Sequence, residues 1–115
     1  KLCSYYSIQS TPGMANNTVL IVAPEHGRNL THNSLVDSYG RYALDHTNDP
    51  TSREIFCLIL GPAGKVKQNT VFTNPQGLGE SIDIVPTIAD VLGFYSDIPL
   101  SYRNKMGNPL TQAFI

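Results

Sequence analysis

Two short apolar runs are typical of β-strands. The first covers residues 18–23 (TVLIVA) and the second covers residues 55–60 (IFCLIL). Neither run alternates apolar with polar residues, and continuous apolar runs of this length are typical of strands covered on both faces of a largely parallel sheet. We therefore expect two buried, mostly parallel strands, with Cys57 buried as a small hydrophobic residue inside the second.

The clearest helical pattern lies in residues 81–94 (SIDIVPTIADVLGF). Its apolar residues recur at helical spacing, namely at Ile84, Val85, Ile88, Ala89, Val91 and Leu92. Asp83 is a candidate N-cap, and Pro86 would lie in the first turn, where its missing N–H costs nothing. Gly93 follows the last apolar position, as expected of a residue that ends a helix in the left-handed conformation.

The remaining segments are polar or rich in turn-forming residues. Residues 25–54 form a long polar stretch, within which residues 34–44 are expected to form a short helix. Residues 65–72 are expected to form an edge strand, and residues 8–14 the end of a helix that runs into a Pro-Gly turn. A connection as long as 25–54 is uncommon in a compact domain unless it is functional.

The length of 115 residues favours a single domain over residues 1–115, and a hydrophobic content of 41% indicates a globular protein. Only 15% are charged, below the usual quarter, which is compatible with a chain that lies against more protein. The few expected strands do not close a doubly wound sheet, so we expect part of a larger α/β domain. A net charge of -1 argues against nucleic acid, and no apolar run reaches the ~20 residues of a transmembrane segment.

The residues best suited to metal binding or catalysis directly follow the first predicted strand. Glu25 and His26 come at its carboxyl end, where functional groups collect in open α/β sheets. A carboxylate and an imidazole are suitable ligands for zinc or manganese, and Gly27 would supply the backbone freedom that lets both reach a metal. His46 precedes the second strand and would open on the same sheet edge if the strands are parallel. Arg28 could clamp an anionic oxygen.

Each of these residues also has a simpler interpretation. Glu25 and His26 could be an exposed loop pair, because Glu-His-Gly alone is a weak motif. His46 could be a solvated loop histidine, and Arg28 an ordinary surface arginine. His32 is expected to be an exposed turn residue.

Three segments, taken in order, resemble the C-terminal portion of the alkaline phosphatase superfamily, which includes sulfatases, nucleotide pyrophosphatases and cofactor-independent phosphoglycerate mutases. The segments are NNTVLIVAPEHGRN, LDHTNDPTSREIFCLILGPAG and ESIDIVPTIADVLGF. The likeness covers roughly residues 8–95, and DIVPTIADVLG is its most specific part. The resemblance implies a partial alkaline-phosphatase-like sandwich, with few, mostly parallel strands and flanking helices.

The resemblance also implies a metal-dependent hydrolase of phosphate or sulfate esters. Glu25 and His26 take the places of the Asp-His pair that binds one of two catalytic metals, and His46 takes the place of the histidine that binds the other. The metal would be zinc, with manganese or calcium as alternatives, and the partner a small anionic ester that Arg28 could contact. Two cations suit this reaction because they neutralise charge on the entering and leaving oxygens. Family members make a periplasmic or extracellular location plausible.

Two differences from the family pattern leave other hypotheses open. Glu25 stands where the family has Asp, and its extra methylene moves the carboxylate by about 1.5 Å. The nucleophile and the other ligands normally lie upstream, so we expect no catalytic nucleophile here and an inactive isolated chain that depends on the rest of its own polypeptide. The alternative is a non-catalytic or degenerate module of the same fold, serving in structure or binding.

A third hypothesis is a small α/β domain unrelated to hydrolysis. It would be favoured if His26 and His46 lay more than ~8 Å apart, because one two-metal site could not then use both.

Overall fold

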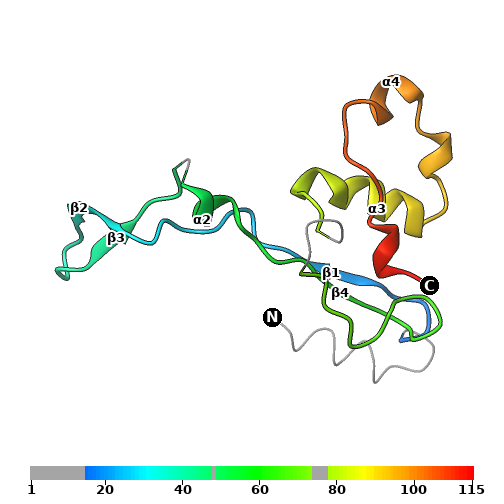
Figure 1. Ribbon diagram of the computed structural model, residues 1–115, viewed down its shortest axis with the longest axis horizontal. Helices are drawn as coiled ribbons and strands as arrows, with labels where there is room; N and C mark the ends of the chain where they lie inside the picture. Colours follow the sequence, from blue (N-terminus) through cyan, green and yellow to red (C-terminus); the bar gives the residue numbers. More distant parts are fainter. Residues whose placement is uncertain (1–14, 48, 74–77) are drawn as a thin grey trace. The chain divides into compact units, whose positions relative to one another are not determined.

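The computed structural model describes residues 15–47, 49–73 and 78–115 of a small mixed α/β chain (Figure 1). The predicted helix end at residues 8–14 lies outside these ranges. Within them, one compact unit comprises residues 15–19 and 60–115, and the other comprises residues 20–59. In chain order the strands (β), α-helices (α) and 3₁₀ helices (η) are β1 (Leu20–Val22), β2 (His32–Val36), β3 (Tyr42–Leu44), α2 (Pro50–Arg53), β4 (Leu58–Leu60), η1 (Ser81–Asp83), α3 (Ile84–Val91), η2 (Tyr95–Asp97), α4 (Leu100–Arg103) and η3 (Thr111–Ala113).

The strands form two small antiparallel sheets, β1–β4 and β2–β3. We predicted mostly parallel strands, whereas both sheets are antiparallel. The prediction failed because an apolar run does not show in which direction the neighbouring strand runs. The prediction of burial on both faces is wrong, since every residue of β1 and β4 is half-buried or exposed. Cys57, predicted to be buried, is exposed, although partial desolvation of its thiol raises the pKa of Cys57.

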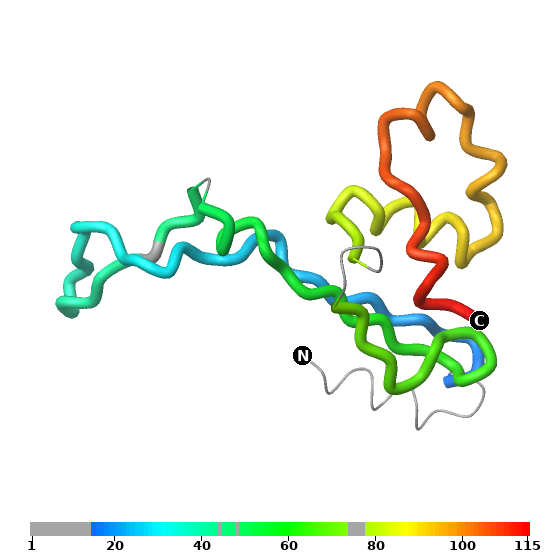
Figure 2. The backbone as a smooth tube through the Cα atoms, in the orientation of Figure 1, coloured from blue at the N-terminus to red at the C-terminus, as the bar shows by residue number. Residues whose placement is uncertain are grey.

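In the unit of residues 20–59, the chain runs from β1 to the β2–β3 hairpin and then returns to β4. Its outgoing and returning segments lie side by side (Figure 2). The N–H of Gly27 donates to the carbonyl of Ser52, and the N–H of Asn29 donates to the carbonyl of Asp45, each at 2.8 Å. Antiparallel pairing of β1 with β4 is therefore continued outward by hydrogen bonds between the segments that flank these strands.

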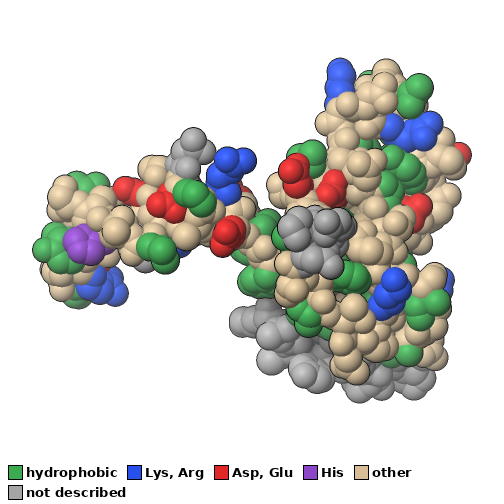
Figure 3. All heavy atoms as spheres, viewed as in Figure 1, with side chains coloured by type: hydrophobic (Ala, Val, Ile, Leu, Met, Phe, Trp, Pro, Cys, Tyr) green, Lys and Arg blue, Asp and Glu red, His purple; other side chains and the backbone are tan. Residues whose placement is uncertain are grey.

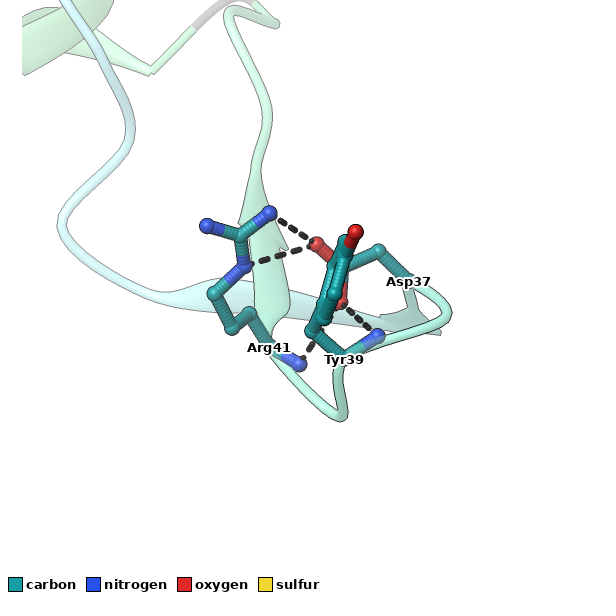
Figure 4. A network of polar contacts seen from close by, with 3 residues as sticks. All are labelled: Asp37, Tyr39 and Arg41. Carbon is teal, nitrogen blue, oxygen red and sulfur yellow. Dashed lines mark hydrogen bonds and ion pairs between the residues drawn. The ribbon is translucent and has the colours of Figure 1, made fainter.

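The β2–β3 hairpin replaces the short helix predicted for residues 34–44, and that prediction is wrong. Its turn is built by Asp37, whose carboxylate accepts hydrogen bonds from the N–H groups of Tyr39 (2.8 Å) and Arg41 (3.0 Å) (Figure 4). The Arg41 guanidinium adds a bond through Nε (2.8 Å) and an ion pair through Nη2 (2.7 Å). The Arg41 N–H, followed by its guanidinium, lowers the pKa of Asp37. Gly40 adopts a φ of +76°, which suits a hairpin turn rather than a helix.

Helix α2 supplies further structure within residues 25–54, which we predicted to have little beyond a short helix. The Asp49 carboxylate caps α2 by accepting from the N–H of Thr51 (2.9 Å) and from its hydroxyl (2.5 Å). The Thr51 hydroxyl, followed by the Thr51 N–H, lowers the pKa of Asp49. Pro50 occupies the start of the helix, where it needs no N–H.

Helix α3 forms where the sequence predicted a helix. Pro86 lies in its first turn, and Gly93 adopts a φ of +81° just beyond its end. The N–H of Gly93 donates to Asp90 and the N–H of Phe94 donates to Ala89, both at 3.0 Å. These two bonds are those of a Schellman motif, in which a left-handed glycine satisfies the last carbonyls of a helix.

Asp83 and Thr87 connect the start of α3 to the C-terminal segment. Asp83 directly precedes α3, but its side chain does not cap that helix; it accepts from the N–H of Glu80 (2.7 Å) and from the N–H of Asn108 (2.8 Å). The Thr87 hydroxyl donates to the Asp83 carbonyl (2.6 Å) and accepts from the N–H of Leu110 (2.8 Å). Two side chains of the DIVPTIADVLG segment therefore hold a distant part of the chain.

Few of the described residues are buried. The buried hydrophobic residues are Val66 and Ala89, and Val66 forms an isolated antiparallel bridge with Phe114. This bridge is what the described residues retain of the edge strand predicted for residues 65–72. Among the described residues of 20–59, Ser52 is the buried one. Hydrophobic side chains lie on the surface near β2 and β3 (Figure 3). No helix in the described ranges is both long and apolar enough to cross a membrane.

Candidate functional site

His26 and His46 lie face to face within the unit of residues 20–59. Their ring centroids are 4.1 Å apart and the ring planes differ by 11°. His26 follows β1 on the outgoing segment, and His46 lies on the returning segment before α2. The structure thus brings together the two histidines that the sequence singled out. It does so through antiparallel side-by-side segments rather than through the shared edge of a parallel sheet.

The hydrogen bond of His26 defines its tautomer. Its Nδ1 lies 2.6 Å from the carbonyl oxygen of Gly27. A carbonyl only accepts hydrogen bonds, so Nδ1 carries the proton, and in the neutral ring Nε2 carries the lone pair. Histidines that bind metals usually have this arrangement, with one ring nitrogen donating to a carbonyl and the other facing the metal.

The parallel rings suit one cation per histidine better than one cation shared by both. A metal bound to imidazole lies close to the ring plane, about 2.0–2.1 Å from the nitrogen. Rings stacked at 4.1 Å place their in-plane lone pairs in two separate, nearly parallel planes. Two-metal hydrolytic sites hold their cations about 3.5–4 Å apart, a spacing similar to that of these rings.

Glu25 and Arg28 are both exposed, on either side of His26 and Gly27. The described residues contain no group of three His, Cys, Asp or Glu side chains placed to hold a metal, so Glu25 does not join the two histidines in such a group. A zinc site takes three or four protein ligands. The histidine pair alone supplies fewer ligands than a zinc site takes, and the metal roles of His26, His46 and Glu25 and the substrate role of Arg28 stay predictions.

A polar network holds the two histidine-bearing segments together. The Asn29 side chain donates through Nδ2 to the Thr47 hydroxyl at 2.8 Å and accepts, through Oδ1, a short hydrogen bond from the Ser52 hydroxyl. Ser52 is only 4% exposed. We did not single out Asn29, Thr47 or Ser52 from the sequence. The partners of Asn29 lie far along the chain, and no local sequence pattern indicates them.

Gly27 matters for its lack of a side chain rather than for unusual backbone angles. A Cβ atom at this position would overlap the carbonyl oxygen of Thr51. Its φ is not positive; among the described glycines, that property belongs to Gly40 and Gly93. We predicted that Gly27 supplies backbone freedom, whereas the structure shows that it permits the close approach of the two segments.

His32 lies apart from this pair, in the hairpin. It is exposed, as predicted, but it belongs to strand β2 rather than to a turn. Its ring stacks on Tyr42, with centroids 4.1 Å apart, and its Nδ1 lies 2.8 Å from the Asn33 carbonyl oxygen. His32 is therefore a stacked histidine with a similar local hydrogen bond but no histidine partner.

Comparisons of the chain with models of known protein families, with curated proteins and with solved structures found no match.

Proposed function

We propose that this chain is the C-terminal segment of a metal-dependent hydrolase of phosphate or sulfate esters and contributes part of a two-metal site. The observation that carries the proposal is the stacked pair of His26 and His46, with ring centroids 4.1 Å apart. Sequence resemblance gave these two residues to different metals of one site, and their separation is compatible with that assignment. A separation of more than ~8 Å would have favoured the third hypothesis, an unrelated domain.

In this proposal His26 binds one cation through Nε2 and His46 binds the other. Zinc is the preferred metal because imidazole is one of its common ligands, with manganese and calcium as alternatives. The metals would neutralise charge on the ester oxygens, and Arg28 would contact the small anionic substrate. Two imidazoles do not complete a site, so the remaining ligands and the nucleophile come from the rest of the polypeptide, and the isolated chain is inactive.

Exposed apolar side chains support a larger domain of the partial alkaline-phosphatase-like type. In residues 20–59 no described hydrophobic residue is buried, whereas Leu30 is 82% exposed, Leu35 69% and Tyr39 81%. An isolated two-stranded hairpin is at best marginally stable in water. We infer that other parts of the same polypeptide cover this hairpin and bring further ligands toward the histidines. A periplasmic or extracellular location is part of the proposal.

The test is the zinc content of the parent protein and of its His→Ala variants. We expect H26A and H46A each to lose bound zinc, because each removes a ligand. H32A is a matched control, since His32 is also a stacked histidine whose Nδ1 approaches a backbone carbonyl. Wild-type zinc content in both H26A and H46A would end the assignment.

The exposure of Glu25 favours a second candidate, a degenerate, non-catalytic module of the same fold. Its carboxylate does not join the histidines in a three-ligand group, as expected if the metal site has decayed. The substitution E25D separates the two candidates. A large gain in zinc affinity or ester hydrolysis would favour a decayed site, whereas a loss of zinc affinity would show that Glu25 is a working ligand.

A further inference from the structure

We propose that Asn29 is the positioning residue that holds His26 and His46 in register. The geometric part of this inference stands on the hydrogen bonds of Asn29; its consequence for metal binding rests on the proposed function. Asn29 lies on the outgoing segment, three residues after His26. All of its partners described below lie on the returning segment, which carries His46.

Asn29 contacts the returning segment at three places. Its N–H donates to the carbonyl of Asp45, the residue before His46, and its Nδ2 donates to the hydroxyl of Thr47, the residue after His46. Its Oδ1 accepts from the hydroxyl of Ser52. His46 is therefore bracketed by two hydrogen bonds from one residue.

Ser52 extends the same connection to the other histidine. Its carbonyl accepts from the N–H of Gly27, the residue after His26, while its hydroxyl binds the Asn29 amide. The Gly27 carbonyl in turn accepts the Nδ1–H of His26. The path from Asn29 through Ser52 and Gly27 thus reaches the atom that sets the tautomer of His26.

The histidine stack needs such a support. Stacking of two small rings contributes too little to align two irregular segments by itself, and His46 is exposed to competing water. Ser52 is buried, so its hydroxyl would lose an acceptor that water does not readily replace if the Asn29 amide were removed. An Asn29→Ala substitution keeps the backbone bond to Asp45 and removes only the two side-chain bonds.

The experiment compares N29A, N29D and N104A in the parent protein that contains these 115 residues. N29D retains oxygens that can accept from both hydroxyls, so it should restore what N29A loses. N104A is the control, because Asn104 is an exposed residue at the end of α4 in the other unit. Two quantities are measured: nuclear Overhauser effects between the His26 and His46 rings, and the zinc affinity by titration.

We expect N29A to lose the inter-ring Overhauser effects and to bind zinc about 10- to 100-fold more weakly, the usual effect of removing a residue that orients a metal ligand. N29D and N104A should resemble the wild type. Overhauser effects that persist in N29A, or that are absent from the wild type, would overturn the positioning role. If N29A loses them but the wild-type parent protein binds no zinc, the positioning role stands and the proposed function loses its support.

A second variant covers the case in which N29A also unfolds the β2–β3 hairpin. S52A removes one of the two side-chain bonds and leaves the bond to Thr47 in place. We expect it to weaken the inter-ring Overhauser effects while the hairpin amide resonances stay unchanged. Unchanged Overhauser effects in S52A would contradict the proposal.

Discussion

At the scale of single residues, Thr87 shows how one buried hydroxyl can join distant parts of the chain. Its side chain is 1% exposed, donates to the Asp83 carbonyl and accepts the N–H of Leu110. The hydroxyl therefore serves both its own helix and the segment that follows α4. The threonine of the DIVPTIADVLG segment thus has a structural role that does not depend on any metal chemistry.

We predict that T87V destabilises the chain by about 1–3 kcal/mol, because valine keeps the shape of threonine but leaves the Leu110 N–H without its acceptor. The control is T70V, since the exposed Thr70 hydroxyl donates to the Gln68 carbonyl on the surface. T70V should stay within about 0.5 kcal/mol of the wild type. The measurement is urea unfolding followed by circular dichroism, and equal effects of the two substitutions would contradict the role of Thr87.

Among the elements, helix α3 has a defined end whose stability depends on one backbone conformation. Gly93 adopts a φ of +81°, and a Cβ at this position would meet no atom within 4 Å. We predict that G93A costs about 1–2 kcal/mol through backbone strain alone. G64A is the matched control, because Gly64 has equally open space and no positive φ, and it should be neutral or slightly stabilising. Similar unfolding free energies for both variants would contradict this account of the helix end.

The stability of the hairpin turn depends on pH, and the sign of this dependence follows from the lowered pKa of Asp37. Its pKa lies below the ordinary value of 3.8, because the Arg41 N–H and guanidinium favour the ionised carboxylate. A lowered pKa in the folded state means that the turn is stabilised above the unfolded pKa and loses this stabilisation as the pH falls through the folded one. We expect the Arg41 Nε–H resonance to report a midpoint below 3.8 and D37N to abolish the transition. A midpoint at or above 3.8 would contradict the hydrogen bonding of the turn.

For the whole molecule, the sequence predicted the features that depend on local signals. Helix α3, with Pro86 in its first turn and Gly93 after its end, follows from spacing and capping chemistry over a dozen residues. The hairpin also had a local signal that we did not use. Asp37 and Gly40 occupy the first and fourth positions of a turn in which the Gly40 N–H donates to the Asp37 carbonyl.

Features that depend on distant partners could not be predicted in the same way. The two apolar runs located β1 and β4 but not their antiparallel direction, which depends on how the chain between them turns back. For the candidate site, residue chemistry indicated His26 and His46. The support from Asn29 and Ser52 became evident only from the structure, because it joins residues 23 positions apart. Strand direction and the polar network are thus properties of the folded chain.

The central claim is that His26 and His46 are metal ligands of one site, and histidine-selective ¹H–¹⁵N NMR during a zinc titration tests it most directly. We predict a coordination shift at His26 Nε2, retention of the Nδ1 proton that donates to Gly27, a shift at His46, and no shift at His32. Zinc-induced shifts absent from both His26 and His46, or as large at His32 as at the pair, would contradict the account.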